Sequence, residues 1–329
     1  MADTPSVAQR TDPDLINPWG IIAGPASIWV NITESSLTKA YQPGGRPFIF
    51  GVHIPGPGGA DEGNPTGLAF NETRAFVLTN GVKRAPATFL MATENGTIAA
   101  WNQSVNRTNA MIVVDESSAG ASYKGIALAT GTNGSPRIYA ANFRLGRVDV
   151  FDAQFNLIAA FTDPTVPAGF APFNIRTIRG SLFVTFAKQA AGLEDDEPGP
   201  GNGFVDIFDT DGTLLRRFAS SGVLNSPWGI TIAPRNFGKF SGALLVGNFG
   251  DGRINAFDLL TSKSLGFLTT SNGDAIEIEG LWGLDFDQRE RAGDECGFTA
   301  DRLYFAAGPG DEEHGLLGYI RAIQKPRWR

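Results

Sequence analysis

The stretch SPWGITIAP, residues 226–234, decides the fold because nearly the same phrase stands elsewhere in the chain. NPWGIIAGP occupies residues 17–25 and GLWGLDF occupies residues 280–286. Three copies of a tryptophan–glycine–aliphatic phrase, so far apart, indicate a repeated structural unit. Looser copies of the phrase are NPTGLAF at 64–70, SYKGIAL at 122–128 and APFNIRTI at 171–178, which brings the number of copies to six.

The spacing of the copies predicts the fold. The equivalent positions are Gly20, Gly67, Gly125, Asn174, Gly229 and Gly283, which lie 47, 58, 49, 55 and 54 residues apart. Each copy leads into short segments bounded by turns, and some of these, such as RVDVFDA and FVDIFDT, alternate polar with apolar residues as a half-buried strand does. The pattern predicts an all-β, six-bladed β-propeller with four antiparallel strands per blade. A β-sandwich does not explain six regular copies, and no long segment keeps a helical period.

The two ends of the chain are less regular than its middle. We expect a single propeller domain over 17–329, preceded by a partly ordered N-terminal arm over 1–16. The last unit shows only three strands, GLWGLDF, RLYFAAG and LLGYIRAI. The segments that could close its blade, SVAQRT at 6–11 and QKPRWR at 324–329, are both poor strands, so incomplete closure is expected.

Composition excludes several functional classes. The 329 residues carry a net charge of −7, one cysteine and two histidines, which excludes an intramolecular disulfide and a cysteine or multi-histidine metal centre. Basic residues do not cluster beyond the short tail KPRWR at 325–329, so nucleic acid is not expected as a main partner. No apolar run is long enough for a membrane span, so no transmembrane helix is expected. The N-terminus lacks the apolar core of a signal peptide, yet glycosylation sequons, if used, predict a secretory or extracellular protein. The sequons begin at Asn31, Asn71, Asn95, Asn102, Asn106 and Asn133.

The repeated phrase also predicts a site. In a propeller the start of each inner strand lies on the same face as the turn between the second and third strands, so both sets of residues meet at one mouth of the central channel. Aromatic walls with a few polar groups are typical of a pocket for a hydrophobic small molecule. The expected substrate-binding residues are Trp19, Trp228, Trp282, Phe143, Phe173, Phe249, Thr66 and Tyr123. The expected catalytic residues are Asn142, Asn174, Asn248, Lys124 and His314. The long turn at 187–203 is expected to fold over the mouth as a lid.

Several of these residues have a second interpretation. The three tryptophans pack between blades or wall a cavity. The three asparagines, with Glu94, offer oxygen ligands for Ca²⁺, or they occupy left-handed turns. His314 is a proton donor or an exposed loop histidine, and His53 is a turn residue. Lys188, like Lys124, is a candidate for contacting a polarised oxygen.

The phrases INPWGI, FVTFAKQ, GPGNGFVDIFDTDG, LNSPWGITIAP and LLVGNFGDGRINAFD resemble, in the same order over about residues 13–286, a family of six-bladed propellers from bacteria and fungi. Most members of that family have no assigned activity, and the first 12 residues depart from its usual longer lead-in. The group includes a fungal branch, the hetero-Diels–Alderases of tropolone sesquiterpenoid biosynthesis. The sequons fit a fungal chain.

Resemblance to that branch implies a cofactor-independent reaction in which a tropolone or phenol quinone methide meets a humulene-type alkene and closes a dihydropyran ring. Such a cycloaddition needs two apolar partners held in one orientation and a donor aimed at the quinone methide oxygen. Two other classes stay open from the residues alone: a calcium-dependent propeller hydrolase or lactonase, and a non-catalytic binding or scaffold propeller.

Overall fold

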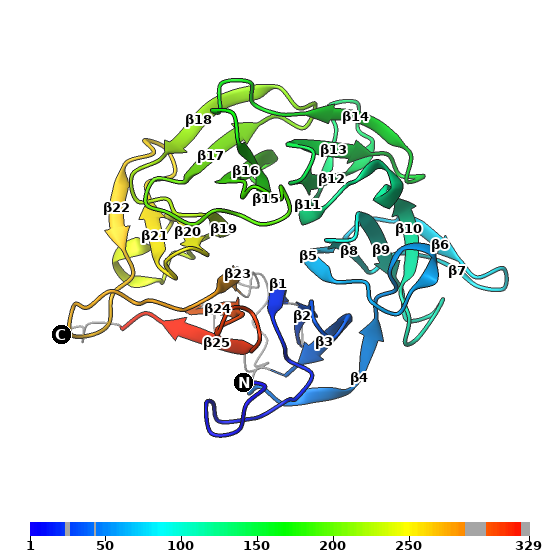
Figure 1. Cartoon of the computed structure of the whole chain (residues 1–329), viewed down its shortest axis with the longest axis horizontal. Coiled ribbons are helices and arrows are strands. Elements are labelled where there is room, and N and C mark those ends of the chain that lie inside the picture. The colour runs from blue at the N-terminus through cyan, green and yellow to red at the C-terminus, as the bar shows by residue number, and fades with distance from the viewer. Residues whose placement is uncertain (24–26, 43, 287–300, 324–329) are drawn as a thin grey trace.

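A computed structural model describes residues 1–23, 27–42, 44–286 and 301–323, so Cys296 and the segment 324–329 lie outside the described residues. Six sheets stand around a central axis, each with its first strand innermost (Figure 1). The predicted all-β, six-bladed propeller is therefore confirmed. Among the described residues, no helix is of a length and apolarity that would cross a bilayer.

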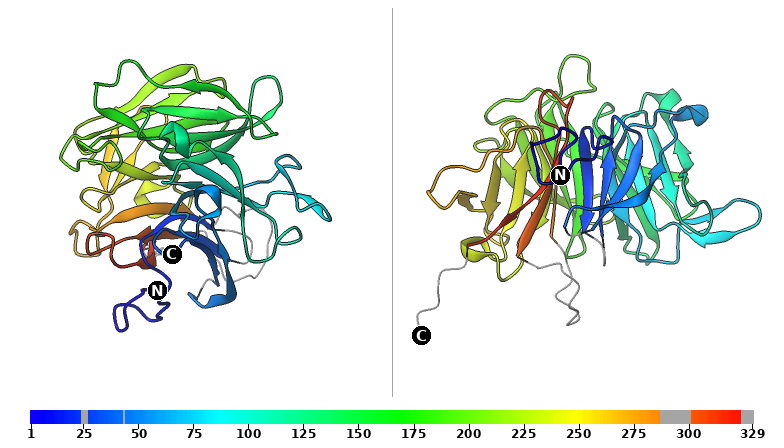
Figure 2. Two further views of the ribbon diagram at one scale, coloured as in Figure 1. Left: turned by 45° about the vertical axis from the view of Figure 1, so that its right-hand side comes forward. Right: turned by 90° about the horizontal axis from the view of Figure 1, so that it is seen from below.

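The blades follow one another along the chain. The strands of blades one to three are β1 (Pro18–Ala23), β2 (Ile28–Ile32), β3 (Leu37–Tyr41) and β4 (Pro47–His53); β5 (Pro65–Phe70), β8 (Phe89–Thr93), β9 (Thr97–Trp101) and β10 (Met111–Asp115); and β11 (Tyr123–Thr130), β12 (Pro136–Asn142), β13 (Arg147–Phe151) and β14 (Leu157–Phe161). The strands of blades four to six are β15 (Phe170–Ile178), β16 (Ser181–Lys188), β17 (Gly203–Phe208) and β18 (Leu214–Ser220); β19 (Pro227–Ile232), β20 (Leu244–Asn248), β21 (Ile254–Phe257) and β22 (Ser264–Phe267); and β23 (Leu281–Phe286), β24 (Arg302–Ala307) and β25 (Leu316–Arg321). A small hairpin of β6 (Val77–Thr79) and β7 (Arg84–Pro86) projects from blade two (Figure 2).

The repeated glycine is what lets six inner strands converge on one axis. In every blade the inner strand slips register against the second strand within the repeated phrase, as a β-bulge does. A Cβ built on Gly67 would lie 2.7 Å from the backbone nitrogen of Ile126 in the next blade, and one on Gly229 would lie 2.5 Å from the carbonyl oxygen of Trp282. Five of the six blades therefore approach the next at a position where only glycine fits, whereas blade four carries Asn174 there, whose Nδ2 donates to Trp228 O of blade five.

The third strands differ from the sequence expectation. Alternation in RVDVFDA and FVDIFDT predicts half-buried strands, but β13, β17 and β21 are buried on nearly every side because neighbouring blades cover both faces. Their polar residues are buried and bonded. Asp149 accepts a hydrogen bond from Arg147 Nε at 2.7 Å, Asp206 is ion-paired with Arg217, and Asn255 bonds a backbone carbonyl. The polar positions of the repeat thus bond within their own blade or to the segment that leads into it.

The first three residues supply the pairing that blade six lacks. Leu317 N–H donates to the carbonyl of Met1 at 2.9 Å, and the Met1 amino group donates back to Leu317 O at 2.7 Å. Asp3 N–H donates to Gly315 O, and Gly315 N–H donates to Asp3 Oδ1 at 3.0 Å. The arm thus lies along the outer edge of β25 (Figures 1 and 2). Residues 1–3, rather than the candidate segment 6–11, make this contact, and the other candidate, 324–329, lies outside the described residues.

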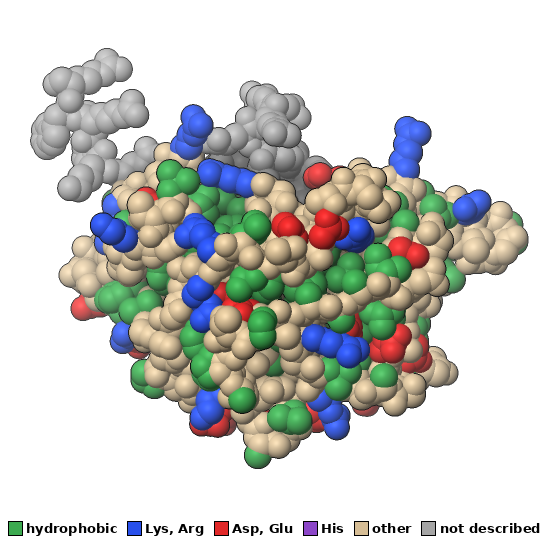
Figure 3. All heavy atoms as spheres, turned by 90° about the horizontal axis from the view of Figure 1, so that it is seen from above, with side chains coloured by type: hydrophobic (Ala, Val, Ile, Leu, Met, Phe, Trp, Pro, Cys, Tyr) green, Lys and Arg blue, Asp and Glu red, His purple; other side chains and the backbone are tan. Residues whose placement is uncertain are grey.

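The outer wall of the ring is mixed in character. On the side drawn in Figure 3, basic, acidic and apolar side chains are interspersed over the outer strands. Exposed apolar side chains of the outer strands include Leu157 and Ile158 on β14 and Leu215 on β18.

Candidate active site at the channel mouth

Six aromatic rings meet on the channel axis. Trp19 and Trp282 stack with ring centroids 3.5 Å apart, Phe249 stacks on Trp282 at 4.0 Å, and Trp228 meets both indoles edge-on. Phe143 and Phe173 complete this aromatic plug. The three tryptophans are only 1–3% exposed, so their rings fill the channel and pack against one another. Of the two interpretations of the tryptophans, packing between blades describes what the rings do.

A buried asparagine that the sequence did not single out ties the plug together. Asn17 Oδ1 accepts hydrogen bonds from Trp19 Nε1 at 3.0 Å and from Trp282 Nε1 at 3.1 Å. Its Nδ2 donates to Glu312 Oε2 at 2.6 Å. The available signal was its place before the proline of the repeated phrase, where Asn17, Asn64 and Ser226 all adopt positive φ. The same side chain therefore links the aromatic plug to the charged groups above it.

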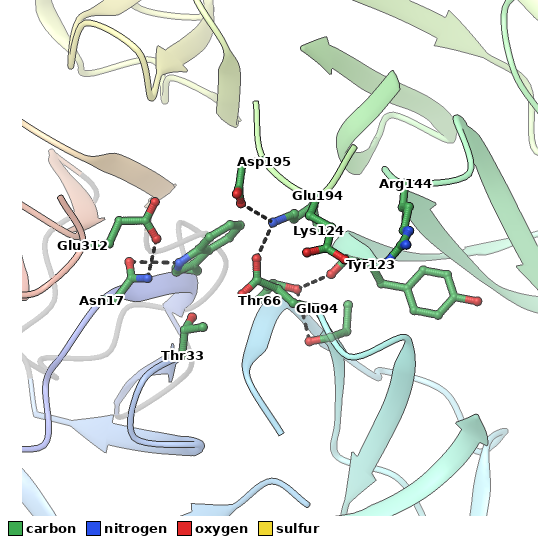
Figure 4. Close-up of polar contacts among 12 residues, drawn as sticks. Asn17, Thr33, Thr66, Glu94, Tyr123, Lys124, Arg144, Glu194, Asp195 and Glu312 are labelled. Carbon is green, nitrogen blue, oxygen red and sulfur yellow. Dashed lines mark hydrogen bonds and ion pairs between the residues drawn. The ribbon is translucent and has the colours of Figure 1, made fainter. Parts of the chain in front are cut away.

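Those charged groups centre on one buried lysine (Figure 4). Lys124 forms an ion pair with Glu94, and its Nζ lies 3.9 Å from Asp195 and 5.1 Å from the centroid of the Trp19 ring. The side chain is 2% exposed. Burial alone would lower the pKa of Lys124, but the carboxylates, Glu94 foremost, outweigh it and raise that pKa. Lys124 is therefore a fixed positive charge at the mouth.

Two carboxyl groups near the lysine are poised to titrate. Burial raises the pKa of Glu312 to about 7, an effect to which the nearby charge of Glu94 adds, while the hydrogen bond from Asn17 opposes it. Burial likewise raises the pKa of Asp196 to about 6. Carboxyls with such pKa values exchange protons readily near neutral pH.

The lid predicted over 187–203 closes the mouth from the side of blade four. Arg144 Nη1 on blade three pairs with Glu194 Oε1 at 2.5 Å, and Lys188 pairs with Glu197 at 2.7 Å within the lid. Gln189 Nε2 donates to the carbonyl of Phe143 at 2.7 Å. Both ion pairs are partly exposed, so water and salt weaken them.

The three predicted catalytic asparagines serve the backbone and their own blades. Asn142 Nδ2 donates to Asp149 at 2.7 Å, Asn174 Nδ2 donates to Trp228 O at 2.8 Å, and Asn248 Nδ2 donates to a backbone carbonyl at 2.8 Å. Asn142 bonds within its own blade, whereas Asn174 reaches the backbone of blade five, 54 residues along the chain. Within the described part of the chain, no three acidic, histidine or cysteine side chains are grouped as metal ligands. Of the oxygens named for the calcium alternative, Asn174 Oδ1 accepts from Ile175 N–H at 2.8 Å and Glu94 is paired with Lys124, whereas Asn248 Oδ1 is buried without a hydrogen-bond partner among the described residues. The calcium alternative stays a prediction.

The remaining predicted residues lie in different places. Thr66 Oγ1 donates to the carbonyl of Tyr123 at 2.7 Å, which joins blade two to blade three at the mouth. The Tyr123 hydroxyl points into blade three, where it bonds Asp149 at 3.2 Å. His314 is exposed and its Nδ1 lies 2.9 Å from Asp3 Oδ2, so it contacts the N-terminal arm. His53 lies at the end of β4 and bonds a backbone carbonyl through Nε2.

Below the aromatic plug the channel holds a cavity of about 170 Å³ lined by the inner strands. Arg176 crosses it from β15. Its Nη1 donates to Ile230 O and Leu284 O at 3.1 Å each, and its Nη2 pairs with Asp285. This guanidinium braces blades four, five and six, and the plug separates the cavity from the charged groups at the mouth.

The sequons differ in accessibility. Asn31 is fully buried and its Nδ2 donates to two backbone carbonyls of blade two, and Asn71 is buried as well. Asn95 and Asn102 are half-buried with Nδ2 bonded to backbone carbonyls. Asn106 and Asn133 are exposed.

Comparison with known proteins gives relatives without assigned activities. No family model matches the chain. Uncharacterised protein R648 of Acanthamoeba polyphaga mimivirus is 32% identical over 327 residues, covering 95% of this chain and 76% of the relative. Uncharacterised protein L690 of the same virus is 32% identical over 331 residues, covering 95% and 82%. A third mimivirus protein, R640, is 36% identical over 300 residues, 86% of this chain, which span 53% of R640.

Among solved structures, virginiamycin B lyase from Staphylococcus aureus superposes with a TM-score of 0.55 at 13% identity, over 94% of this chain and 96% of that one. A streptogramin B lyase gives a TM-score of 0.52 at 14% identity over the same shares. At such identities the likeness shows the propeller fold alone.

Proposed function

The chain belongs to the same family as the uncharacterised mimivirus proteins R648 and L690, and from the charged centre at its channel mouth we propose that it is a small-molecule enzyme that transfers a proton. One observation carries the proposal. Glu312 is a partly buried carboxyl with a pKa of about 7. It lies near the buried Lys124–Glu94 ion pair, above the aromatic plug.

We assign each group a role from its position and charge. Glu312 takes or gives the proton, because its pKa lies near neutral pH, where general acids and bases act best. Lys124 holds the negative charge that develops on a substrate oxygen. Its second acidic neighbour, Asp195, is 3.9 Å away on the exposed lid, beyond hydrogen-bond reach, so a substrate oxygen can take that side of the ammonium.

The supporting elements are rigid. Asn17 fixes the carboxyl of Glu312 and both stacked indoles through one amide. The aromatic plug keeps water from reaching the site through the channel, which strengthens charge interactions there. The lyase structures show that a propeller of this kind is compatible with lyase chemistry in those proteins, whereas the roles of Glu312 and Lys124 are inferred from the charged centre itself.

The first experiment measures the pKa of the Glu312 carboxyl. With ¹³C-labelled glutamate, the Glu312 carboxyl signal, assigned with Glu312→Gln, should titrate near pH 7. A midpoint near 4.5 would remove the acid–base role. Turnover is then sought with aryl esters, γ-lactones and β-elimination substrates. We expect Glu312→Gln to lower kcat at least about 100-fold, whereas Glu313→Gln, at an exposed carboxyl in the same loop, leaves it unchanged.

A hetero-Diels–Alder cycloaddition is the second candidate. It is favoured by the meeting of the predicted aromatic residues directly beneath Lys124, which would polarise the quinone methide oxygen. The rings would have to separate, since they are 0–3% exposed apart from Phe249. The two candidates differ at Glu312. With an o-quinone methide and humulene as probes, a cycloaddition keeps its rate and product ratio in Glu312→Gln, and proton transfer does not.

A further inference from the structure

A second cavity, separate from the channel, opens at the seam between blades one and six. Its volume is about 570 Å³, within the range of small-molecule sites. The N-terminal arm forms one wall through residues 8–10, blade one contributes Tyr41 and Gln42, and blade six contributes Arg302 and Tyr319. Figure 1 shows the arm at this seam, beside β25. The cavity therefore lies where the ring is closed.

The charge of this cavity is opposite to that of the mouth. Two guanidinium groups, Arg10 and Arg302, line it, and its lining contains no aspartate or glutamate among the described residues. Arg10 Nε donates to the carbonyl of Gly44 at 2.9 Å, and no ion pair with a described residue engages the rest of its guanidinium. An anion entering the cavity would thus meet two positive charges in the lining, while Asp12, which accepts a hydrogen bond from the lining residue Tyr41, is paired with Lys39 at 2.6 Å.

Of the two arginines, Arg302 gives the stronger evidence for an anion site. Its Nε is buried, and it has no hydrogen-bond partner within the described ranges. The guanidinium instead lies 4.5 Å from the centroid of the Tyr319 ring. The neighbouring Arg321, by contrast, is paired with Asp301 at 2.5 Å. An unpaired buried donor is unfavourable, and it is more so when the group is charged. An anion in the cavity would meet the positive charge of this guanidinium.

The cavity lining also offers aromatic and apolar surface to the organic part of a ligand. The Tyr319 ring is 48% exposed and already carries a stacked guanidinium on one side. Ile28, Leu316 and Leu317 add apolar surface to the lining. We propose that this seam cavity binds a small organic anion, whose carboxylate or phosphate group is held by Arg302 and Arg10 and whose planar or apolar body packs on Tyr319.

Binding at the seam is coupled to closure of the ring. The cavity has the arm on one side and two blades on the other, so an occupant links segments that are more than 290 residues apart in sequence. A ligand that binds only the folded ring raises its melting temperature. The site is independent of the function proposed for the mouth, and Glu312→Gln leaves it unchanged.

The experiment uses the whole chain with phenyl phosphate, benzoate, inorganic phosphate and neutral benzamide as probes in calorimetry and thermal unfolding. We expect phenyl phosphate or benzoate to bind and to raise the melting temperature by about 2–4 °C. Inorganic phosphate should bind at least about 10-fold more weakly, and benzamide should not bind, because charge and body are both needed.

Substitutions test whether the organic anion binds in the seam cavity. Arg302→Met should weaken the organic anion at least about 10-fold and Arg10→Gln about 3-fold or more, while Arg84→Met, an exposed arginine on β7, changes nothing. Arg10 is exposed, so that variant keeps the test decisive if Arg302→Met fails to fold. Absence of binding by both organic anions, benzamide binding as well as benzoate, or affinity unchanged in both seam variants would overturn the proposal.

Discussion

At the scale of single residues, the repeated glycine decides what the ring tolerates. The position of a Cβ on Gly67 is surrounded by backbone atoms of the next blade, 2.7 Å from Ile126 N and 2.8 Å from Gly125 Cα. Backbone atoms in adjoining inner strands cannot move aside as the end of a flexible side chain can. The space left at this position is therefore that of a hydrogen atom.

We expect Gly67→Ala to lower the free energy of unfolding by about 1–3 kcal/mol, because the added methyl group overpacks the contact between blades two and three. Urea unfolding measures the change. Gly192→Ala on the lid is the matched control, since nothing lies within 4 Å of its Cβ position. Equal stability of the two variants would mean that the blades are not in contact at this glycine.

At the scale of elements, the third strands combine a buried position with a polar residue. Asp206, in the middle of β17, is fully buried, and Arg217 contacts both it and Asp163. Burial raises the pKa of Asp206 to about 7, the neighbouring Asp163 adds to this effect, and Arg217 opposes it. β17 therefore carries a carboxyl that keeps its proton at pH values where an ordinary aspartate has lost it.

The sign of the pH effect follows from that shift. Because the folded-state pKa of Asp206 lies above its unfolded value, its contribution to stability is fully present below about pH 4 and is lost as the pH rises through 7. We expect Asp206→Asn to reduce the loss of unfolding free energy between pH 5 and pH 8 by on the order of 3 kcal/mol. Denaturant unfolding at the two pH values checks this. Glu34→Gln, at an exposed carboxyl, should keep the wild-type slope, and the same slope in Asp206→Asn would contradict the assignment.

At the scale of the whole molecule, the ring is closed in two ways. The inner strands β1 and β23 meet as neighbouring blades elsewhere do, with Gly283 against Trp19 and Ile21. At the rim, four hydrogen bonds join residues 1–3 to Gly315 and Leu317. The second contact spans almost the full length of the chain, so it resists opening of blade six away from blade one.

Removal of residues 1–3 should lower the melting temperature by roughly 5 °C or more, because each lost hydrogen bond contributes about 1 kcal/mol. Hydrogen exchange should become faster in β25 and stay unchanged in β19 to β21 of blade five. Val7→Ser, an exposed position in the same arm, serves as the control. Slow exchange in β25 after the deletion would show that the arm does not support the blade.

The sequence by itself determined the blade number and the four-stranded plan, because a glycine is required wherever six inner strands crowd one axis and that requirement recurs in the chain at nearly every blade. It also predicted that six aromatic residues meet at one mouth, and they do meet there. Only the tertiary structure decided that these rings stack on one another, that Asn17 meets Glu312 across 295 residues, and that residues 1–3 reach β25. Local pattern reports where strands and turns lie, whereas the burial of the third strands and the partners on different blades depend on the geometry of the closed ring.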